Sequence, residues 1–314
     1  MQSRLQSGLR IAVRYNTVLI FLGMLVVSAC VSDNFFTAVN LSNLIRQVAP
    51  VGIISMGMLL VILTAGIDLS VGSVMAMIGV LSALLTHVMP LPWAVLTAIA
   101  AGVLLGSLSG YLIAFHKMAP FIATLALMTI ARGLGFILSK GAPVMIADSA
   151  MGLTRFGNGY LFGVPNPAWI LLLVFALTFI VLRYHVFGRI IIAIGSNEEA
   201  VRLSGIRVSL YLLAVYAIIG GLSAVAGIIG TARTSVGSPI VGVGLELDVI
   251  ATVVIGGASL FGGKGSAVNT LLGVLIIGMI GNTMNLLDIP SYAQQVIKGV
   301  IILLAVLLQK FEDK

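Results

Sequence analysis

Long apolar runs recur along the whole chain and are separated by short polar stretches. Because about 20 residues of α-helix cross the hydrocarbon core of a bilayer, these runs predict transmembrane helices. The helices are expected near residues 17–31, 48–65, 71–88, 93–115, 119–138, 167–184, 209–231, 247–261, 266–282 and 291–309. The pattern therefore predicts an all-α polytopic membrane protein of about ten transmembrane helices, with both chain ends on one side.

No long soluble segment interrupts these runs, so residues 1–314 are expected to form a single integral membrane domain. Two polar stretches are larger than the other connections, at residues 139–166 and 185–208. The first contains Pro143, Pro165 and several glycines, which suit an ordered cap on the outer side of the membrane. A plain connecting loop is the alternative.

The second polar stretch carries the signals of a short helix, because residues 188–206 read GRIIIAIGSNEEAVRLSGI. Ser196 and Glu199 have the spacing of a capping box, in which each side chain satisfies a backbone N–H at the helix start. Glu198 lies in the expected first turn, where the helix dipole favours anions, and Gly205 follows as a left-handed stop. A helix of about two turns is predicted.

This short helix would present a small apolar face to its surroundings. Ala200 and Leu203 lie three residues apart, while Glu198, Glu199 and Arg202 offer polar contacts. Two interpretations follow: the helix docks on a partner, or it is a solvated loop between two spans.

Composition agrees with burial in lipid. Hydrophobic residues make up 60% of the chain and charged residues 9%, with a mean hydropathy of +1.18, whereas about 25% of the residues of a soluble domain are charged. With the amino terminus in the cytoplasm, eleven of the 17 Lys and Arg residues fall on the inner side, as the positive-inside rule requires. These are Arg4, Arg10, Arg14, Lys117, Arg183, Arg189, Arg202, Arg207, Lys264, Lys310 and Lys314. The net charge of +7 then reflects topology and anionic lipid and gives no reason to expect a nucleic-acid partner.

A weak internal repeat links residues 66–81, GIDLSVGSVMAMIGVL, to residues 244–259, GLELDVIATVVIGGAS, at an offset of 178 residues. Four identical residues match at this offset, and Asp68 aligns with Glu246. In the expected topology the two segments begin on opposite sides of the membrane, as an inverted repeat requires. Chance similarity between glycine-rich apolar segments is the alternative.

Acidic residues stand at the entries to two of the expected spans. Asp68 lies between Gly66 and Gly72, so a broken helix is expected there, and an acid at a broken transmembrane helix is a candidate functional residue. The alternative is structural, with Asp68 or Ser70 capping the following helix. The same two interpretations apply to Glu246 and Asp248.

Two cations fall inside expected spans. A charge at the bilayer centre costs at least about 2.5–3.5 kcal/mol, so both Arg132 and Lys298 should be paired or reach water as structural buried charges. Lys298 could pair with Asp248, Glu246 or Asp288. Arg132 could extend towards the outer surface.

The sequence does not indicate an enzyme. His87, His116 and His185 are far apart, so no metal site is expected. The cluster Gly262-Gly263-Lys264-Gly265-Ser266 lacks the spacing of a phosphate-binding loop and predicts a tight cytoplasmic turn. The chain therefore has no recognisable means of hydrolysing ATP.

Three motifs occur in order along the chain: GIDLSVGS at 66–73, GRIIIAIGSNEEAVRLSGI at 188–206 and LELDVIATVVIGGASLFGGKG at 245–265. Together they resemble the permease subunits of ribose-type ABC monosaccharide importers, and the resemblance runs nearly end to end. It implies a type II importer fold of ten helices with an inverted repeat, in the bacterial inner membrane with both termini cytoplasmic. It also implies three protein partners: a cytoplasmic ABC ATPase that binds ATP and magnesium, a periplasmic sugar-binding protein, and a second permease copy or paralogue. No cofactor would be bound by this chain itself.

The resemblance also assigns roles to the polar residues. Residues 188–206 would be the coupling segment that docks on the ATPase. The expected ATPase-coupling residues are Gly188, Gly195, Ser196, Asn197, Glu198, Glu199, Ala200, Leu203 and Gly205. Candidates for the translocation pathway are Asp68, Ser70, Glu246 and Asp248. Glycine is expected at position 196 in relatives, so Ser196 is a small departure.

The implied function is ATP-driven import of a monosaccharide, a ribose-like pentose or a hexose, from periplasm to cytoplasm. The competing hypothesis is an ion-coupled secondary transporter or channel for a small polar solute. In that case Asp68 or Glu246 would bind a proton or ion, and no ATPase would be needed.

Overall fold

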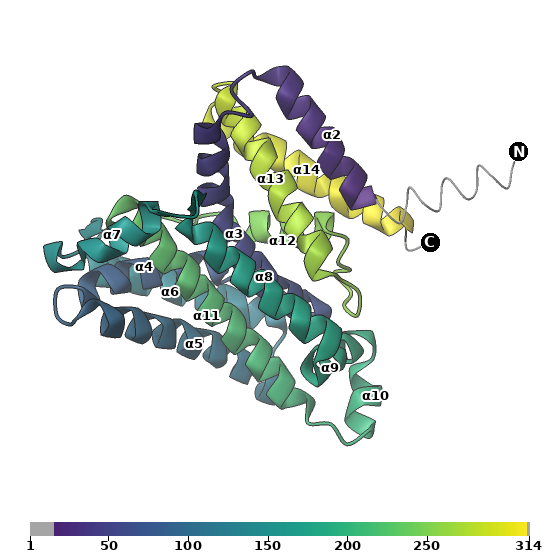
Figure 1. Ribbon diagram of the computed structural model, residues 1–314. Helices are drawn as coiled ribbons and strands as arrows, with labels where there is room; N and C mark the ends of the chain where they lie inside the picture. The colour runs from purple at the N-terminus through teal and green to yellow at the C-terminus, as the bar shows by residue number, and fades with distance from the viewer. Residues whose placement is uncertain (1–15, 313–314) are drawn as a thin grey trace, which may run out of the picture.

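The computed structural model describes residues 16–312, and they form an almost entirely helical protein (Figure 1). The basic residues Arg4, Arg10, Arg14 and Lys314, which support the expected orientation, lie outside the described residues. In chain order the helices are α2 (Asn16–Val31), α3 (Ala38–Leu63), α4 (Val71–Leu85), α5 (Leu91–His116), α6 (Pro120–Ser139), α7 (Met151–Asn158), α8 (Asn166–Tyr184), α9 (Val186–Ser196), α10 (Glu198–Leu203), α11 (Val208–Thr234), α12 (Leu245–Ile255), α13 (Ala267–Leu286) and α14 (Ser291–Glu312).

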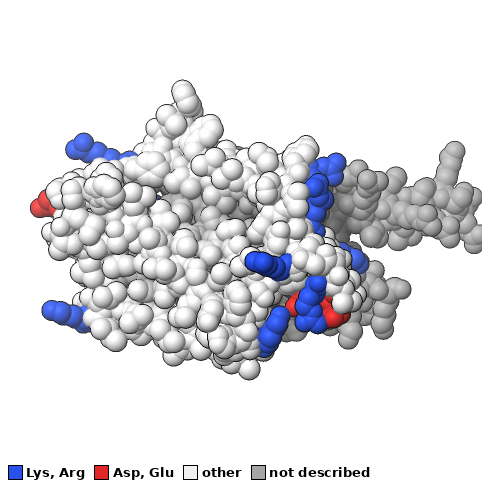
Figure 2. Space-filling model, turned by 90° about the horizontal axis from the view of Figure 1, so that it is seen from below, with Lys and Arg blue, Asp and Glu red and all other residues white. Residues whose placement is uncertain are grey.

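Helices occur at all ten positions where apolar runs predicted spans, but they differ in length. Six helices of the described part are long and apolar enough to cross a membrane, namely α3, α5, α6, α8, α11 and α13. The helices α2 and α4 are apolar but shorter. The all-α membrane architecture is therefore confirmed, while the count of ten crossings stays a prediction. Charged side chains gather at the left and right ends of the view in Figure 2, and the surface between them is almost free of charge.

The long helices α3 and α11 form the centre of the molecule. α11 packs closely on α5 because glycines face each other, and a Cβ at Gly106 would lie 2.9 Å from the Cα of Gly220. Tyr216 of α11 is fully buried beside this contact. In Figure 1, α4, α5, α6 and α11 lie in the lower part, and α2, α13 and α14 lie above them.

Pro50 lies inside α3 and cannot donate the usual backbone hydrogen bond to the carbonyl of Arg46. That carbonyl instead accepts a bond of 2.9 Å from the Nη1 of Arg233, at the end of α11. Before Pro50, Leu44 and Val48 pack in a cluster with α13, whereas the second half of α3 packs with α11. α3 therefore joins the two groups of helices.

Two long helices are followed by a break and then a short helix. α3 ends at Leu63 and α4 begins at Val71, and α11 ends at Thr234 while α12 begins only at Leu245. The eighth predicted span, 247–261, is therefore wrong in length, because α12 has 11 residues and extends about 16 Å. It ends at Ile255 because Gly256 and Gly257 follow, and Gly257 has a left-handed φ of 79°.

Residues 139–166 are ordered by short elements. Strand β1 (Val144–Met145) pairs antiparallel with β4 (Val236–Gly237), and β2 (Tyr160–Leu161) pairs with β3 (Val164–Pro165). The 3₁₀ helix η1 (Asp148–Ala150) and α7 complete the segment, at the left of Figure 1. The β1–β4 pair ties the segment to the chain between α11 and α12.

Candidate functional site

The predicted coupling segment, residues 188–206, lies on two consecutive short helices, α9 and α10, after a sharp turn from α8. His185 is extended, and its Nδ1 accepts a hydrogen bond of 3.1 Å from the N–H of Phe187 at the start of α9. The turn requires Gly188, because a Cβ there would lie 2.7 Å from the Cα of Leu182 in α8. Ile191 and Ile194 bury the inner face of α9.

The predicted capping box is wrong by one residue. The N-cap of α10 is Asn197, whose Oδ1 accepts a bond of 2.9 Å from the N–H of Ala200. Ser196 is the last residue of α9 and donates its hydroxyl to the carbonyl of Ile192 at 3.0 Å. Asparagine caps helices as well as serine does, and Ser196 is not available as a cap because it is still part of α9. The left-handed stop at Gly205 is confirmed, with a φ of 82°.

One residue of α10 is buried against the protein, and the other residues of the helix are exposed. Val201 is buried, whereas Ala200 is exposed and the side chain of Leu203 is 79% exposed. The acidic residues expected in its first turn already have partners, because Glu198 pairs with Lys117 at 3.1 Å and Glu199 pairs with Arg202. The hydrogen bond from Arg202 lowers the pKa of the Glu199 carboxyl, which favours its charged form.

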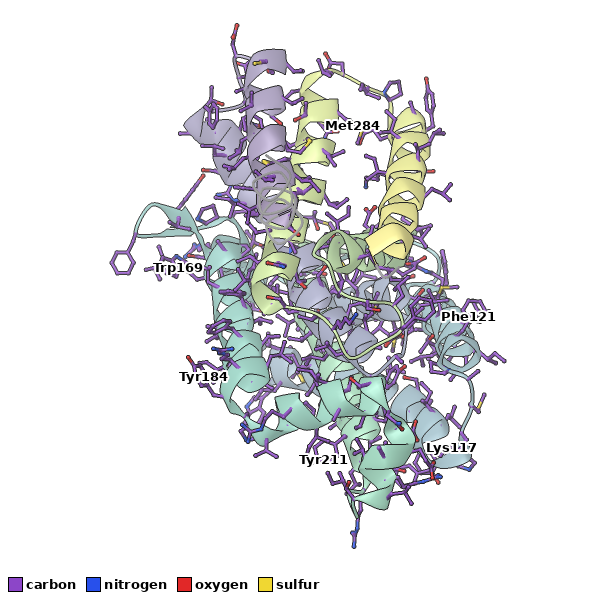
Figure 3. The ribbon with its side chains drawn as sticks, turned by 90° about the vertical axis from the view of Figure 1, so that its right-hand side faces the viewer. Lys117, Phe121, Trp169, Tyr184, Tyr211 and Met284 are labelled. Atoms are coloured by element: carbon purple, nitrogen blue, oxygen red, sulfur yellow. The ribbon has the colours of Figure 1, made fainter. Side chains whose placement is uncertain are left out.

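The pair between Lys117 and Glu198 was not foreseen from the sequence. Lys117 is the left-handed residue that ends α5, just before α6 begins. It also lines a cleft of about 420 Å³ beside α10, together with Arg202, Arg207 and Phe115. Lys117 and Tyr211 are labelled in the lower part of Figure 3.

The coupling segment touches the ends of two other elements at Gly195. A Cβ at Gly195 would lie 2.6 Å from the N of Gly263 and even closer to the carbonyl oxygen of Leu63. Gly263 itself donates its N–H to that same oxygen at 3.1 Å. Backbone from α9, from the end of α3 and from the turn after α12 therefore meets without intervening side chains.

The first candidate pathway acid is a local structural element in this conformation. Asp68 is 1% exposed, and one of its oxygens accepts the N–H of Ser70 at 2.8 Å and the hydroxyl of Ser70 at 2.6 Å. Ser70 is the residue that precedes α4 and is also buried. This geometry is an Asx turn that ends where α4 begins, and the Ser70 side chain makes no capping bond to that helix.

The second acid motif meets the first at the start of α4. A Cβ at Gly72 would lie 2.8 Å from the Oε2 of Glu246, and it would also clash with the carbonyl of Gly242. Arg132 of α6 holds the loop before α12, because its Nη1 donates to the carbonyls of Pro239 at 2.6 Å and Val241 at 2.8 Å. Arg132 is also near enough to Glu246 to interact electrostatically. The two broken helices therefore approach each other in the region that Arg132 braces.

The structure selects one partner for Lys298 among the three acids considered. Its Nζ lies 2.6 Å from the Oδ2 of Asp248, and both side chains are about three-quarters buried, with 28% and 21% exposed. One turn earlier on α14, the Nε2 of Gln294 donates to the Oδ1 of Asn285 at 2.9 Å. Among the described residues, no group of three or more His, Cys, Asp or Glu side chains is placed to hold a metal ion.

The comparisons with known proteins cover nearly the whole chain. The model of a family described as "Branched-chain amino acid transport system / permease component" matches residues 40–306. The ribose import permease protein RbsC of Haemophilus influenzae is 43% identical over 93% of this chain and 92% of its own length. RbsC of Bacillus subtilis is 45% identical over 92% of this chain and 91% of its own. The L-arabinose transport system permease protein AraH of Escherichia coli is 37% identical over 97% of this chain and 93% of its own. No solved structure matches the chain.

Proposed function

The chain belongs to the family of transport-system permease components, and we propose that it is the membrane subunit of an ATP-driven monosaccharide importer. The observation that carries the proposal is the similarity, over more than nine-tenths of both chains, to permeases named for ribose import. The similarity to an L-arabinose permease supports the sugar class and leaves pentoses as the first substrates to examine. As a permease subunit, the chain is a translocating component and not an enzyme.

We further propose that ten helices lie in a bacterial inner membrane as an inverted repeat, with both termini in the cytoplasm, and that α12 is too short to cross the membrane by itself. The proposal is supported by the order and length of the helices. α3 and α11 have 26 and 27 residues, and each is followed by a break, a shorter helix and two more helices. The starts of the short helices meet at Gly72, Gly242 and Glu246, near the point where related segments of an inverted repeat would cross.

Three partners complete the proposed importer: a cytoplasmic ABC ATPase, a periplasmic sugar-binding protein, and a second permease copy or paralogue. The ATPase would bind ATP and magnesium, and this chain would bind no cofactor. α10 is the proposed ATPase contact, since Ala200 and Leu203 are exposed on a capped helix whose acids are held by Lys117 and Arg202. Lipid would cover the uncharged surface seen in Figure 2.

The proposed mechanism is alternating access driven by differential binding of ATP to two states of the complex. The loaded binding protein docks outside, ATP closes the ATPase subunits, and their movement reaches the permease through α9 and α10. An ion-coupled mechanism is less well supported, because Asp68 accepts two bonds from Ser70 and Glu246 lies near enough to Arg132 to interact with its charge.

Co-purification tests this proposal directly. The tagged chain would be expressed in its host with its neighbours and purified in mild detergent, and co-purifying proteins would be identified by mass spectrometry. We expect a stoichiometric ATPase, and we expect Leu203→Asp to reduce its recovery because a charge would be placed in the apolar contact. Asp148→Lys, an exposed charge reversal in residues 139–166, is the control that should not change recovery. A chain that transports solute without an ATPase would refute the proposal.

A further inference from the structure

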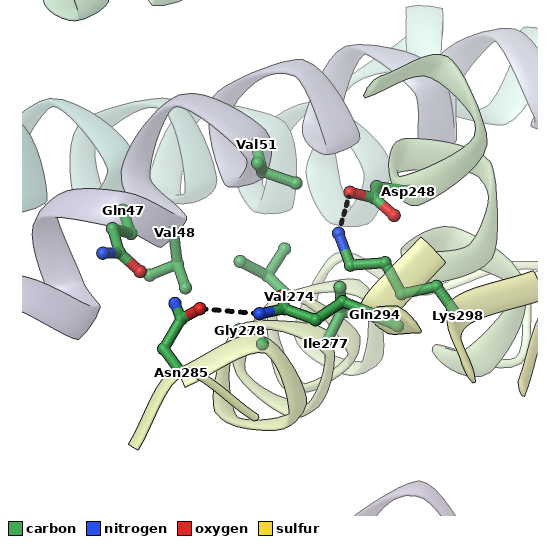
Figure 4. Close-up of a pocket in the computed structure, with 11 residues that line it drawn as sticks. Gln47, Val48, Val51, Asp248, Val274, Ile277, Gly278, Asn285, Gln294 and Lys298 are labelled. Atoms are coloured by element: carbon green, nitrogen blue, oxygen red, sulfur yellow. Dashed lines mark hydrogen bonds and ion pairs between the residues drawn. The ribbon is translucent and has the colours of Figure 1, made fainter. Parts of the chain in front are cut away.

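A cavity of about 180 Å³ lies between α3, α12, α13 and α14 (Figure 4). Val51 of α3 and Ile277 of α13 contribute to an apolar wall. Val48, Val274 and two glycines of α13 extend this wall, and the polar part of the lining comes from Gln47, Asp248, Asn285, Gln294 and Lys298. The cavity would hold about six water molecules at about 30 Å³ each, which is the space of a small polar solute.

The polar residues of this cavity are arranged in two groups. Gln294 donates to Asn285 at 2.9 Å and to the carbonyl of Ile289 at 2.8 Å, so its amide is fixed in direction. Lys298 and Asp248 form the second group at the other side of the cavity in Figure 4. Because that ion pair neutralises itself, the cavity carries no net charge and favours a neutral ligand over an ion.

Gln47 is the residue whose role the fold does not explain. Its side chain is exposed and forms no hydrogen bond with the described part of the chain. It also lines a second cavity, of about 270 Å³, between α3, α4 and α11, so it stands where the two cavities adjoin. A carboxamide offers two N–H donors and a carbonyl acceptor, the combination that neighbouring hydroxyl groups require.

The cavity lies towards one end of the molecule. Gln47 is in the first half of α3, Asn285 is near the end of α13, and Gln294 is in the first turn of α14. These parts of the helices face the connections α2–α3 and α13–α14 at the top of Figure 1. In the proposed topology this end faces outwards, so a solute released by a binding protein would reach it before the breaks at Asp68 and Glu246.

We propose that this cavity is a monosaccharide site of the permease itself, in which Gln47, Asn285 and Gln294 hydrogen-bond the hydroxyl groups of the sugar. The inference rests on the proposed function and adds a place where the permease holds its substrate. The amides of Asn285 and Gln294, which are held by their hydrogen bond to each other, orient the sugar. Gln47 binds it from α3, on another wall of the cavity. The apolar wall receives the C–H face of the sugar ring.

The test is sugar uptake by the whole importer, reconstituted in vesicles with its ATPase and binding protein. Uptake of radiolabelled D-ribose, L-arabinose and D-glucose would be measured beside ATP hydrolysis, at saturating binding protein and sugar. Gln47→Leu removes an amide that forms no bond within the described residues, so the fold should be retained. We expect it to lower the uptake rate about three- to tenfold, the effect of losing one neutral hydrogen bond, while ATP hydrolysis persists.

Gln295→Leu is the matched control, because it makes the same change on α14 at an exposed residue next to the cavity residue Gln294. It should leave uptake unchanged. Wild-type uptake by Gln47→Leu, or an equal loss in Gln295→Leu, would overturn the sugar site while the importer function stands. Wild-type vesicles that take up none of the three sugars would overturn the proposed function and the site with it.

Discussion

Replacing Gly195 by alanine tests the contact between the coupling segment and the rest of the protein. The added methyl group would lie 2.6 Å from the N of Gly263, where ordinary contact begins at 3.4 Å, and closer still to the carbonyl oxygen of Leu63. Both neighbours are backbone atoms, which cannot rotate away. The backbones must therefore separate by at least about 0.8 Å to clear the N of Gly263, and by more to clear the carbonyl oxygen of Leu63, which also disturbs the 3.1 Å bond between these two groups.

The cost of that separation follows from its parts. Overpacking costs about 1–3 kcal/mol, and a weakened backbone hydrogen bond about 0.5–1.5 kcal/mol more. The higher helix propensity of alanine than of glycine in α9 offsets up to about 1 kcal/mol of this destabilisation. A net loss of about 2 kcal/mol should lower the melting temperature by about 3 °C, because an unfolding entropy of about 2.1 cal/mol/K per residue amounts to about 0.66 kcal/mol/K for 314 residues.

The assay is thermal denaturation of a fluorescent fusion in detergent, followed by size-exclusion chromatography. Gly23→Ala is the matched control, because Gly23 lies inside α2 and nothing lies within 4 Å of its added Cβ. The control should melt at or above the wild-type temperature. If Gly195→Ala melts with Gly23→Ala, the close backbone contact is not what holds the coupling segment, and the reasoning is refuted.

Three further predictions follow from individual side-chain contacts. Asp248→Asn should destabilise the chain by about 1–3 kcal/mol, less than for a fully buried pair, and adding Lys298→Met should recover most of the loss of melting temperature. Asn197→Ala should weaken α10 by about 1 kcal/mol, seen as faster amide hydrogen exchange in residues 200–203, whereas Ser196→Ala should not. Arg132→Leu should cost about 1–3 kcal/mol and make the loop 238–244 more sensitive to proteolysis, because two carbonyls lose their donor; unchanged cleavage would contradict the bracing role.

The positions of the helices could be predicted from the sequence because long apolar runs indicate which residues lie in the membrane. Their ends could not, since an end depends on what lies beside it. The hydrophobic pattern predicted that the eighth span continues through Ala258 and Ser259, but the chain turns at Gly257 and then contacts the end of α3 through the bond from Gly263 to Leu63. A continued helix and a turn have the same hydrophobicity here, so the apolar pattern could not show that Gly256 and Gly257 end the helix.

The partners of the charged residues could not be predicted from the sequence. Asp248, Glu246 and Asp288 were equal candidates for Lys298, and only the packing of α12 on α14 brought one of them to 2.6 Å. Gln47 gave no sequence signal, because a single amide near the start of an apolar run resembles an ordinary interfacial residue. A polar residue within reach of several polar residues on other helices becomes noticeable only when the fold is known.

The backbone contact at Gly195 bears on how a movement of the coupling segment would spread. Leu63 is the last residue of α3, five residues before Asp68, and Gly263 lies in the turn that follows α12. Because both contact α9 through backbone atoms, no side-chain rotation can absorb a displacement of α9. A displacement of α10 that moves α9 would therefore also move the end of α3 and the turn after α12, the two connections that flank the broken helices. Lys117 adds a third path to the start of α6 through Glu198, and α6 carries the Arg132 that holds the loop before α12. Under the proposed mechanism, movement of α10 would thus reach the segments that hold Asp68 and Glu246 from both sides.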